Sequence, residues 1–365
     1  MSQFYEERLE RDLNRLRERV AEVAAHVEQA LKDALRAVLH QDKRLANATV
    51  LGDMPINRAI REIDRLCHFF VARHLPSAGH LRFISSVLRM IIALERIGDY
   101  AVTMAREAKV LSRPLGDEIQ RDLKRMADEA FHMLHQAIEA FNDRNAELAK
   151  GTMGYAYQLD HTFSDAFDML VKKGEEDAYS IVDLFGILIL FNRLERVSDQ
   201  AKNICEETVF AVTGETKKPK VYRVLFLDEA DDCRSQMAVA IARKAYPTGG
   251  AYTSAGRHPA AQVDPACVAF MAEHGHELNG SQPRRFEEIS EDWKDNHVVV
   301  SLEGPVERYV PEVPFHTIAL EWEVPRPAAP DAGDEAQRTA FEAIFRQLAA
   351  NIGELMETLH GEEAS

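Results

Sequence analysis

The sequence has few cysteines, no long hydrophobic run and no excess of positive charge, and each shortage argues against a class of protein. Its four cysteines, among 365 residues, show no CxxC spacing and fit reduced thiols rather than a disulfide framework. The longest apolar run, LFGILILF at 184–191, is too short to span a bilayer. A net charge of −16 argues against binding to nucleic acid.

Motifs of several enzyme classes are absent as well. The sequence contains no P-loop, no glycine-rich dinucleotide fingerprint and no Ser/His/Asp arrangement. Its first residues, MSQFYEERLERDLNR, are charged and lack the apolar core of a signal peptide. We therefore expect a cytoplasmic protein.

The first part of the chain has the periodicity of amphipathic helices, interrupted at PSAGH (76–80) and SRPLGD (112–117). The pattern predicts tandem three-helix bundles at 1–114 and 115–214. One helix of the second bundle is expected from Asn145 to about Gly174. In the first helix, apolar residues recur at alternating spacings of four and three: Leu9, Leu13, Leu16, Val20, Val23 and Val27.

One phrase occurs twice, one hundred residues apart: LERIGDYA at 94–101 and LERVSDQA at 194–201. Residues i and i+4 of a helix lie on one face, with Cβ atoms about 6 Å apart. Each phrase therefore places a glutamate and an aspartate side by side. The pairs are Glu95 with Asp99, and Glu195 with Asp199.

Two adjacent carboxylates repel each other, so each pair needs a compensating positive charge. Hard cations such as Mg²⁺ and Mn²⁺, and also iron, bind carboxylate oxygens. A metal site is one interpretation. The other is that Arg96, Arg193 or a neighbouring helix neutralises an ordinary solvated face.

The sequence changes character after an expected linker at 215–220. Residues 221–360 alternate strand-like and helix-like segments and end in a helix from Glu335 to His360, which predicts an α/β domain with a parallel sheet. Most of the net negative charge lies in this part of the chain. The expected strands are VYRVLFL (221–227), HVVVSLEG (297–304) and TIALEW (317–322).

Over about 1–215 the sequence resembles the PhoU family of phosphate-signalling regulators. The resemblance rests on the two repeated phrases, on GDMPINRAIREID (52–64) and on the proline-containing turn that precedes the first phrase. It implies bound metal ions, divalent or ferric: iron, zinc, manganese or magnesium. The implied ligands are Glu95, Asp99, Glu195 and Asp199, with further carboxylates from Asp53, Asp64 and Asp160.

The PhoU resemblance also implies an adaptor rather than an enzyme. Its expected partners are the ATPase subunit of a phosphate ABC transporter and a membrane histidine kinase, through which it would restrain phosphate uptake and the starvation response. The second domain described below leaves arsenate open as an alternative to phosphate. We expect a homodimer that contacts the membrane only through these partners.

A second resemblance covers about 221–330. In VLFLDEADDCRSQMA (224–238), a strand leads through a tight loop to Arg234 and Ser235 at the start of a helix, an arrangement that binds oxyanions on backbone N–H groups. The stretch resembles the signature loop of low-molecular-weight tyrosine phosphatases and thiol-dependent arsenate reductases. TSAGRHPAAQVDPACVAFMAEHGHEL (253–278) continues the resemblance.

The catalytic groups of that family have no counterparts in this sequence. The nucleophilic cysteine falls at Asp228, and Cys233 matches a cysteine that is not the nucleophile. Glu303 and, approximately, Tyr309 replace the two further cysteines of the reductases. Pro325 or Arg326 replaces the general acid, and the loop is acidic at Asp228, Glu229, Asp231 and Asp232.

We therefore expect a catalytically inactive sensor or docking domain, in which Arg234 and Ser235 cap a degenerate oxyanion loop. Two alternatives stay open. One is an active arsenate reductase or phosphatase that uses Cys233 or Asp228. The other is a helical scaffold whose carboxylate pairs only form salt bridges.

Overall fold

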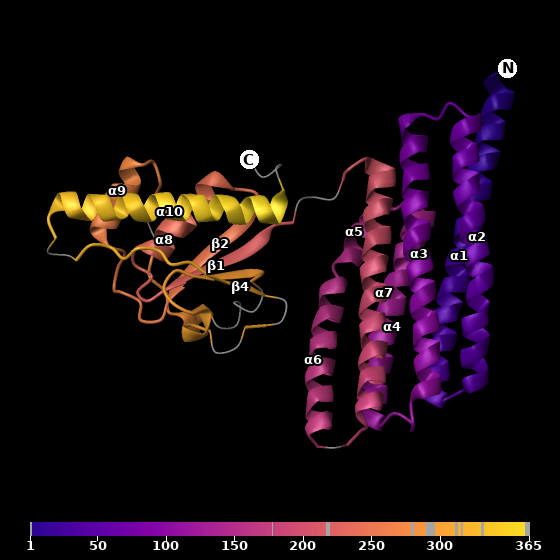
Figure 1. Ribbon diagram of the computed structural model, residues 1–365. Coiled ribbons are helices and arrows are strands. Elements are labelled where there is room, and N and C mark those ends of the chain that lie inside the picture. The colour runs from indigo at the N-terminus through magenta and orange to yellow at the C-terminus, as the bar shows by residue number, and fades with distance from the viewer. Residues whose placement is uncertain are drawn as a thin grey trace. The chain divides into compact units, whose positions relative to one another are not determined.

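The chain divides into two compact units, Met1–Lys217 and Lys218–Ser365 (Figure 1). The first is helical, and the second contains a parallel sheet, so the expected fold class is confirmed. Residues 217–219 of the expected linker lie outside the described residues. The computed structural model describes residues 2–176, 178–216, 220–278, 281–289, 296–310, 313–314, 317–329 and 332–361.

The first bundle consists of α1 (Ser2–His40), α2 (Lys43–Arg73) and α3 (Ala78–Val110). Side chains cap two of these helices at their N-termini. Asp42 accepts hydrogen bonds from the backbone N–H groups of the first turn of α2, and Ser77 accepts one at the start of α3. The apolar face of α1 that the sequence predicts is buried.

Between 117 and 213 the described residues form four helices rather than the three expected. The expected helix from Asn145 to Gly174 is broken at Gly154 and Tyr155. There the N–H of Tyr155 bonds the carbonyl of Thr152 at 3.1 Å, three residues back. Glycine disfavours helix continuation, which explains the break. The helices are α4 (Asp117–Asn142), α5 (Ala146–Met153), α6 (Ala156–Glu175) and α7 (Ile181–Thr213).

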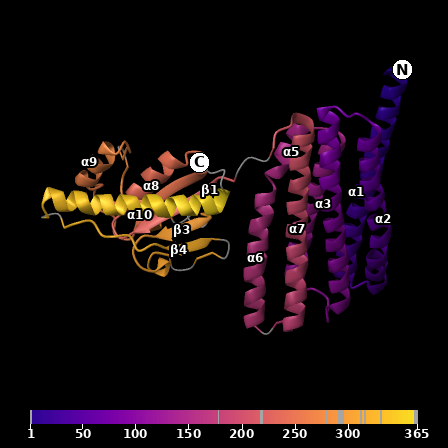
Figure 2. The same ribbon diagram turned by 45° about the horizontal axis from the view of Figure 1, so that its top comes forward.

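The helices that carry the repeated phrases, α3 and α7, pack against each other (Figures 1 and 2). Near one end of this contact, Nη1 of Arg89 donates to both carboxylate oxygens of Glu207, at 3.0 and 3.1 Å. Near the other end, Arg193 of α7 lies close to Glu107 of α3. Burial raises the pKa of Glu107, and the charge of Arg193 opposes this effect. The helices are therefore antiparallel. None of the described helices is long and apolar enough to cross a membrane.

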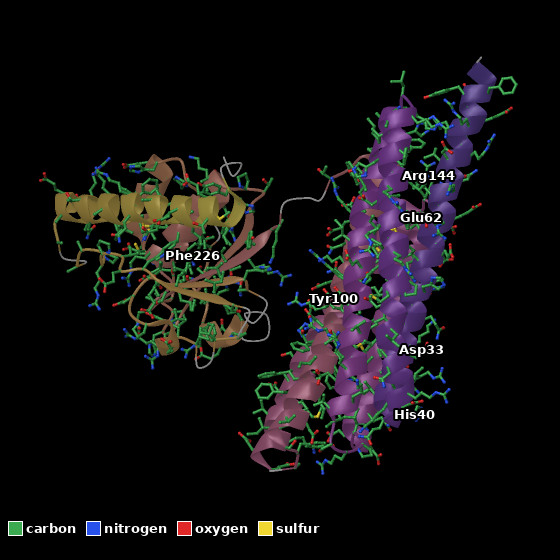
Figure 3. The ribbon with its side chains drawn as sticks, turned by 45° about the vertical axis from the view of Figure 1, so that its right-hand side comes forward. Asp33, His40, Glu62, Tyr100, Arg144 and Phe226 are labelled. Atoms are coloured by element: carbon green, nitrogen blue, oxygen red, sulfur yellow. The ribbon has the colours of Figure 1, made fainter. Side chains whose placement is uncertain are left out.

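The described strands of the second unit form one parallel sheet in the order β2-β1-β3-β4. Phe226 of β1 is fully buried in this unit (Figure 3). Because the strands are parallel, the segments that follow them meet at one edge of the sheet. The elements are β1 (Tyr222–Asp228), α8 (Arg234–Ala245), β2 (Gly250–Gly256), α9 (Pro265–Glu273), β3 (Val298–Ser301), β4 (Ile318–Glu321) and α10 (Asp334–His360).

The sequence predicts β1, β3, β4 and the final helix, but it does not predict β2. TGGA (248–251) is expected as a turn, and only its first half is one, because β2 begins at Gly250. The segment GAYTSAG has a glycine at each end and no β-branched apolar run, so its strand pairing depends on β1 beside it rather than on local preference.

Candidate functional site

Asp53 of α2 faces the first carboxylate pair. Glu95 and Asp99 lie one turn apart on the exposed side of α3, with Gly98 between them. Asp53 packs against Gly98, where an added Cβ atom would lie 3.4 Å from its Oδ1. The sequence includes Asp53 among the implied further ligands, and the structure brings it to the pair.

The carboxylate of Asp53 is only partly satisfied by hydrogen bonds. Its Oδ2 accepts a bond of 2.6 Å from Nδ2 of Asn57, whereas its Oδ1 is buried and has no partner within the described part of the chain. The pKa of Asp53 is raised, first by burial and then by the charge of Asp99. An unpaired buried carboxylate oxygen is costly, and a cation bound beside it would offset that cost.

The second pair has a third carboxylate as well. The pKa of Asp160 on α6 is raised, first by partial removal from solvent and then by the charge of Asp199. The pKa of half-buried Glu195 is raised by burial, and the charges of Asp199 and Asp160 add to this effect. Both bundles thus place an aspartate from the preceding helix beside the repeated phrase.

The two pairs differ in how their charge is balanced. In the second, Arg196 contacts both carboxylates: its Nε lies 3.3 Å from Glu195 and its Nη1 lies 3.1 Å from Asp199. In the first, Glu95 and Asp99 form no ion pair with any described residue. The salt-bridge interpretation thus fits the second pair better than the first.

Asp64 lies apart from these clusters. It is eleven residues beyond Asp53 on α2, about 16 Å along the helix. Its Oδ2 lies 3.5 Å from Nδ1 of His68. No three His, Cys, Asp or Glu side chains among the described residues converge closely enough to hold a metal ion. The exposed side chains of Glu95 and Asp99 would have to rotate toward an ion.

The donor set nevertheless fits a hard cation. Each cluster offers carboxylate oxygens from two neighbouring helices, together with the unpartnered oxygen of Asp53 in the first bundle. Oxygen-only ligands suit Mg²⁺, Mn²⁺ or Fe³⁺ better than Zn²⁺, which usually takes histidine or cysteine.

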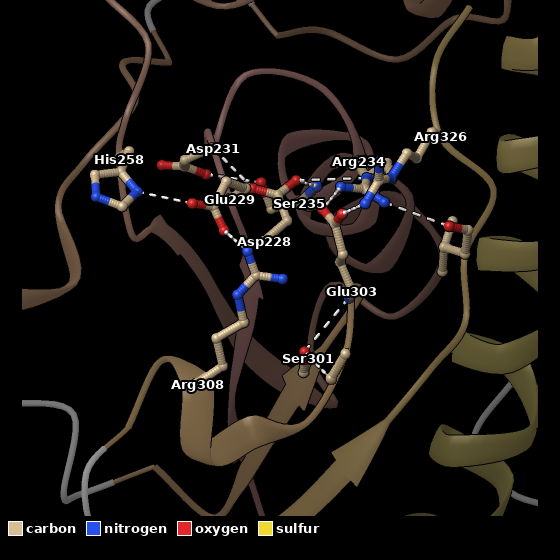
Figure 4. A network of polar contacts seen from close by, with 12 residues as sticks. Asp228, Glu229, Asp231, Arg234, Ser235, His258, Ser301, Glu303, Arg308 and Arg326 are labelled. Atoms are coloured by element: carbon tan, nitrogen blue, oxygen red, sulfur yellow. Dashed lines mark hydrogen bonds and ion pairs between the residues drawn. The ribbon is translucent and has the colours of Figure 1, made fainter.

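In the second unit, Asp228 at the end of β1 accepts hydrogen bonds from the loop that follows it (Figure 4). Its Oδ1 accepts from the N–H of Asp231 at 2.6 Å, and its Oδ2 from the N–H of Ser235 at 3.1 Å. Asp228 is 2% exposed, and burial raises its pKa. Its carboxylate therefore occupies one N–H group of the loop and one at the start of α8 that could otherwise bind an anion.

The other acidic residues of this loop also have partners or are partly buried. Asp231 accepts from Oγ of Ser235 at 2.9 Å and from the N–H of Arg284 at 2.8 Å, and burial raises its pKa to about 6. Burial, followed by the charge of Asp228, raises the pKa of Asp232.

Glu229 and Cys233 complete the loop. Glu229 contacts His258 at 2.7 Å and Arg308 at 2.9 Å. Cys233 is 1% exposed, and its pKa is raised well above the ordinary thiol value, first by a hydrogen bond with Cys267 and then by burial. A buried thiol with a raised pKa is a poor nucleophile.

Arg234, expected to cap the loop, lies with its Nε 4.0 Å from Oδ2 of Asp228 and forms an ion pair with Glu303 after β3 (Figure 4). Its Nη2 lies 2.5 Å from Oε2 of Glu303, and its Nη1 donates to the carbonyl of Val324 at 3.3 Å. Arg326 bonds the other oxygen of Glu303. The sequence identifies Glu303 and Arg326 only as replacements of lost catalytic groups. It gives no local signal for their pairing, nor for the contacts of His258 and Arg308.

The fold and these sites define a two-bundle helical protein, with carboxylate clusters on its repeated helices, joined to a phosphatase-like α/β domain. The chain belongs to the PhoU family. The model of the PhoU domain matches residues 20–108 and 123–208. The model of the low molecular weight phosphotyrosine protein phosphatase matches residues 223–365, so the expected fusion of two domain types is confirmed.

Two named relatives support the assignment to the PhoU family, and a third structure is similar to the C-terminal unit. A phosphate-specific transport system accessory protein PhoU homolog of Pseudomonas putida is 32% identical over 205 residues, which are 56% of this chain and 80% of that protein. The crystal structure of PhoU from Pseudomonas aeruginosa is 30% identical over 56% of this chain and 99% of its own, with a TM-score of 0.55. The arsenate reductase from Archaeoglobus fulgidus is 25% identical over 36% of this chain and 98% of its own, with a TM-score of 0.30.

Proposed function

We propose that this protein is an accessory regulator of phosphate transport that acts as an adaptor. The supporting observation is its similarity, over nearly the whole helical unit, to proteins named as accessory to the phosphate-specific transport system. Its partners would be the ATPase subunit of a phosphate ABC transporter and a membrane histidine kinase. The proposal includes a homodimer, a cytoplasmic location and membrane contact only through these partners.

Metal binding at the two carboxylate clusters is part of this proposal. The unpartnered oxygen of Asp53 and the raised pKa values of Asp53, Asp160 and Glu195 support it. These residues would hold the ion, and the ion would supply the positive charge that the clusters lack. A bound ion that links α2 to α3, or α6 to α7, would also fix the surface that a partner contacts.

We further propose that the C-terminal unit is catalytically inactive. A phosphatase or reductase of this fold needs a thiolate nucleophile at the position of Asp228, and the neighbouring thiol of Cys233 is buried with a raised pKa. The competing function is an arsenate reductase or phosphatase that uses Cys233 or Asp228. Turnover of arsenate or a chromogenic phosphate ester, abolished by Cys233→Ser or Asp228→Asn, would establish that function instead.

The adaptor role is tested with the purified ATPase subunit of the phosphate transporter from the same organism. We expect the full chain to bind it and to change its ATP hydrolysis, and Asp99→Asn/Asp199→Asn to weaken both effects. Asp128→Asn, on an exposed position of α4, is the matched control. Absence of binding and of any change in hydrolysis would reject the proposal for this partner.

A further inference from the structure

We propose that two copies of this chain associate through two oppositely charged helix faces, a basic face on α2 and an acidic face on α6. The basic face carries Arg58 and Arg61, and the acidic face carries Asp165 and Asp168. The basic face of each copy would contact the acidic face of the other. This inference rests on the homodimer that the proposed function includes, and it names the surface that forms this dimer.

The two faces occupy equivalent positions of the two repeats. Asp53 of α2 and Asp160 of α6 are equivalent, because each lies beside the repeated phrase of its own bundle. The arginines of the basic face lie five and eight residues beyond Asp53, and the aspartates of the acidic face lie five and eight residues beyond Asp160. The same helix positions therefore carry positive charge in one bundle and negative charge in the other.

The arginines of the basic face have no acidic partner within the described part of the chain. Arg58 and Arg61 are exposed and one turn apart, and Arg65, one turn further along α2, is exposed as well. None of the three forms an ion pair with a described residue. The nearby Glu62 is bound by α1, since its Oε2 lies 2.5 Å from Nη2 of Arg19. The arginines thus line a groove of about 690 Å³ with their charges uncompensated.

The aspartates of the acidic face have the same spacing as these arginines. Asp165 and Asp168 are exposed, and neither forms an ion pair with a residue that the structure describes. Lys172 is one turn beyond Asp168 but does not pair with it, and Lys173 binds Glu118 at 3.1 Å instead. Because the two faces match in spacing and are opposite in charge, each is a suitable partner for the other.

The position of the two faces leaves both available to a second copy. Helices α2 and α6 lie on opposite sides of the helical unit, with α3 and α7 between them (Figures 1 and 2). Within one chain the two faces therefore do not meet. When both contacts form between the same two copies, a twofold axis relates them, and the assembly closes as a dimer.

Exposed apolar side chains beside the charges would add to the contact. Met54, one turn before Arg58 on α2, is 66% exposed. Phe167 and Val171, beside the aspartates of α6, are each 47% exposed. Ion pairs at a surface contribute little by themselves, so burial of these apolar groups would supply affinity, while the charges would select the matching face.

The test is the oligomeric state of the full chain, measured by sedimentation velocity over a range of protein concentrations. The parent should be a dimer. Arg58→Asp/Arg61→Asp makes both faces acidic, and Asp165→Arg/Asp168→Arg makes both faces basic. Each variant should therefore have a dimer dissociation constant at least about tenfold higher than that of the parent.

A mixture of the two variants tests the pairing directly. In the mixture, the reversed α2 face of one variant meets the reversed α6 face of the other, and the two unchanged faces also meet. We expect a heterodimer about as stable as the parent dimer. The control is Arg121→Asp/Arg125→Asp, which reverses two exposed arginines of α4 and should remain a dimer. Circular dichroism checks that every variant is folded.

Four results would overturn the proposal. Charge-reversed variants that dimerise as tightly as the parent would place the dimer contact on another surface, and the homodimer itself would stand. The same conclusion follows from a mixture of folded variants that forms no heterodimer, or from a control that dissociates as readily as the two variants. A monomeric parent would reject the homodimer together with this inference. The adaptor test would remain valid in each case, since it measures binding to the ATPase subunit.

Discussion

The carboxylate of Asp53 packs against Gly98, and a Cβ atom on Gly98 would lie 3.4 Å from its Oδ1. The first repeat has glycine at this position and the second has Ser198, whose hydroxyl bonds the carbonyl of Glu195 at 2.7 Å. A small residue at this point lets an aspartate of the neighbouring helix approach the carboxylate pair.

Replacing Gly98 with valine should therefore displace Asp53 from the first cluster. The added methyl groups would overlap its carboxylate, so we expect loss of metal from the first site and a destabilisation of about 1–3 kcal/mol. Metal content and urea denaturation measure the two effects. Ser198→Ala, which removes one hydroxyl in the second repeat, serves as the control. Unchanged metal content in Gly98→Val would show that the approach of Asp53 to the first cluster is not needed for metal binding.

Removal of metal should destabilise the helical unit. A ligand that binds only the folded state raises stability, so a chelator should lower the Tm of the parent. Asp99→Asn/Asp199→Asn should already have the lower Tm and respond little to the chelator. We would measure Tm by scanning calorimetry and metal content by mass spectrometry. Equal chelator effects on both proteins would contradict a role for these aspartates as ligands.

The stability of the C-terminal unit should depend on Asp231 in a defined pH window. Its folded pKa is about 6, above an unfolded value of about 4, so the folded state retains a proton that the unfolded state loses. Stability should fall as pH rises from about 4 to 6, by up to roughly 3 kcal/mol from this group.

Asp231→Asn tests that pH dependence, because it cannot ionise and asparagine tolerates the φ of 49° found here. Denaturant unfolding at pH 4.5 and 7.5 should show a smaller pH effect in the variant than in the parent. The same pH slope in both proteins would show that Asp231 titrates normally.

Thiol reagents should find no fast-reacting cysteine in the folded protein. All four cysteines are buried, and the pKa values of Cys67 and Cys205 are raised to about 12, chiefly by burial. A colorimetric disulfide reagent should react slowly in buffer and with four thiols in guanidinium. A single fast thiol that disappears in Cys233→Ser would instead favour the enzyme alternative.

Much of the helical unit is predictable from its sequence, because long amphipathic helices carry their periodicity locally. The repeat also identifies the two pairs, since i and i+4 share a face whatever the tertiary packing. The break at Gly154 is not predicted, because the residues on both sides of it continue the helical pattern. The choice between Asp53 and Asp64 depends on which turn of α2 lies opposite Gly98, and that is a property of packing.

Local sequence patterns do not predict the contacts of Arg234 either, because these contacts also depend on tertiary packing. Its contact with Glu303 requires β1 and β3 to be neighbours in the sheet and requires the turn at Gly304. Neither condition follows from the residues near Arg234 in the chain. The sequence does indicate that Glu303 stands at the position of a catalytic group of the related enzymes. It does not indicate which residues Glu303 contacts.

The contact between α3 and α7 has a consequence for how the two bundles are related. Glu107 and Glu207 are equivalent positions of the two repeats, and each lies near an arginine of the other helix, Arg193 and Arg89, so the two helices meet in an antiparallel and roughly reciprocal way. Such reciprocity is the mark of a twofold interface between identical subunits. Two separate copies of a single bundle, related by a twofold axis, would meet through this same pair of helices, so the contact inside this chain has the form of a dimer interface.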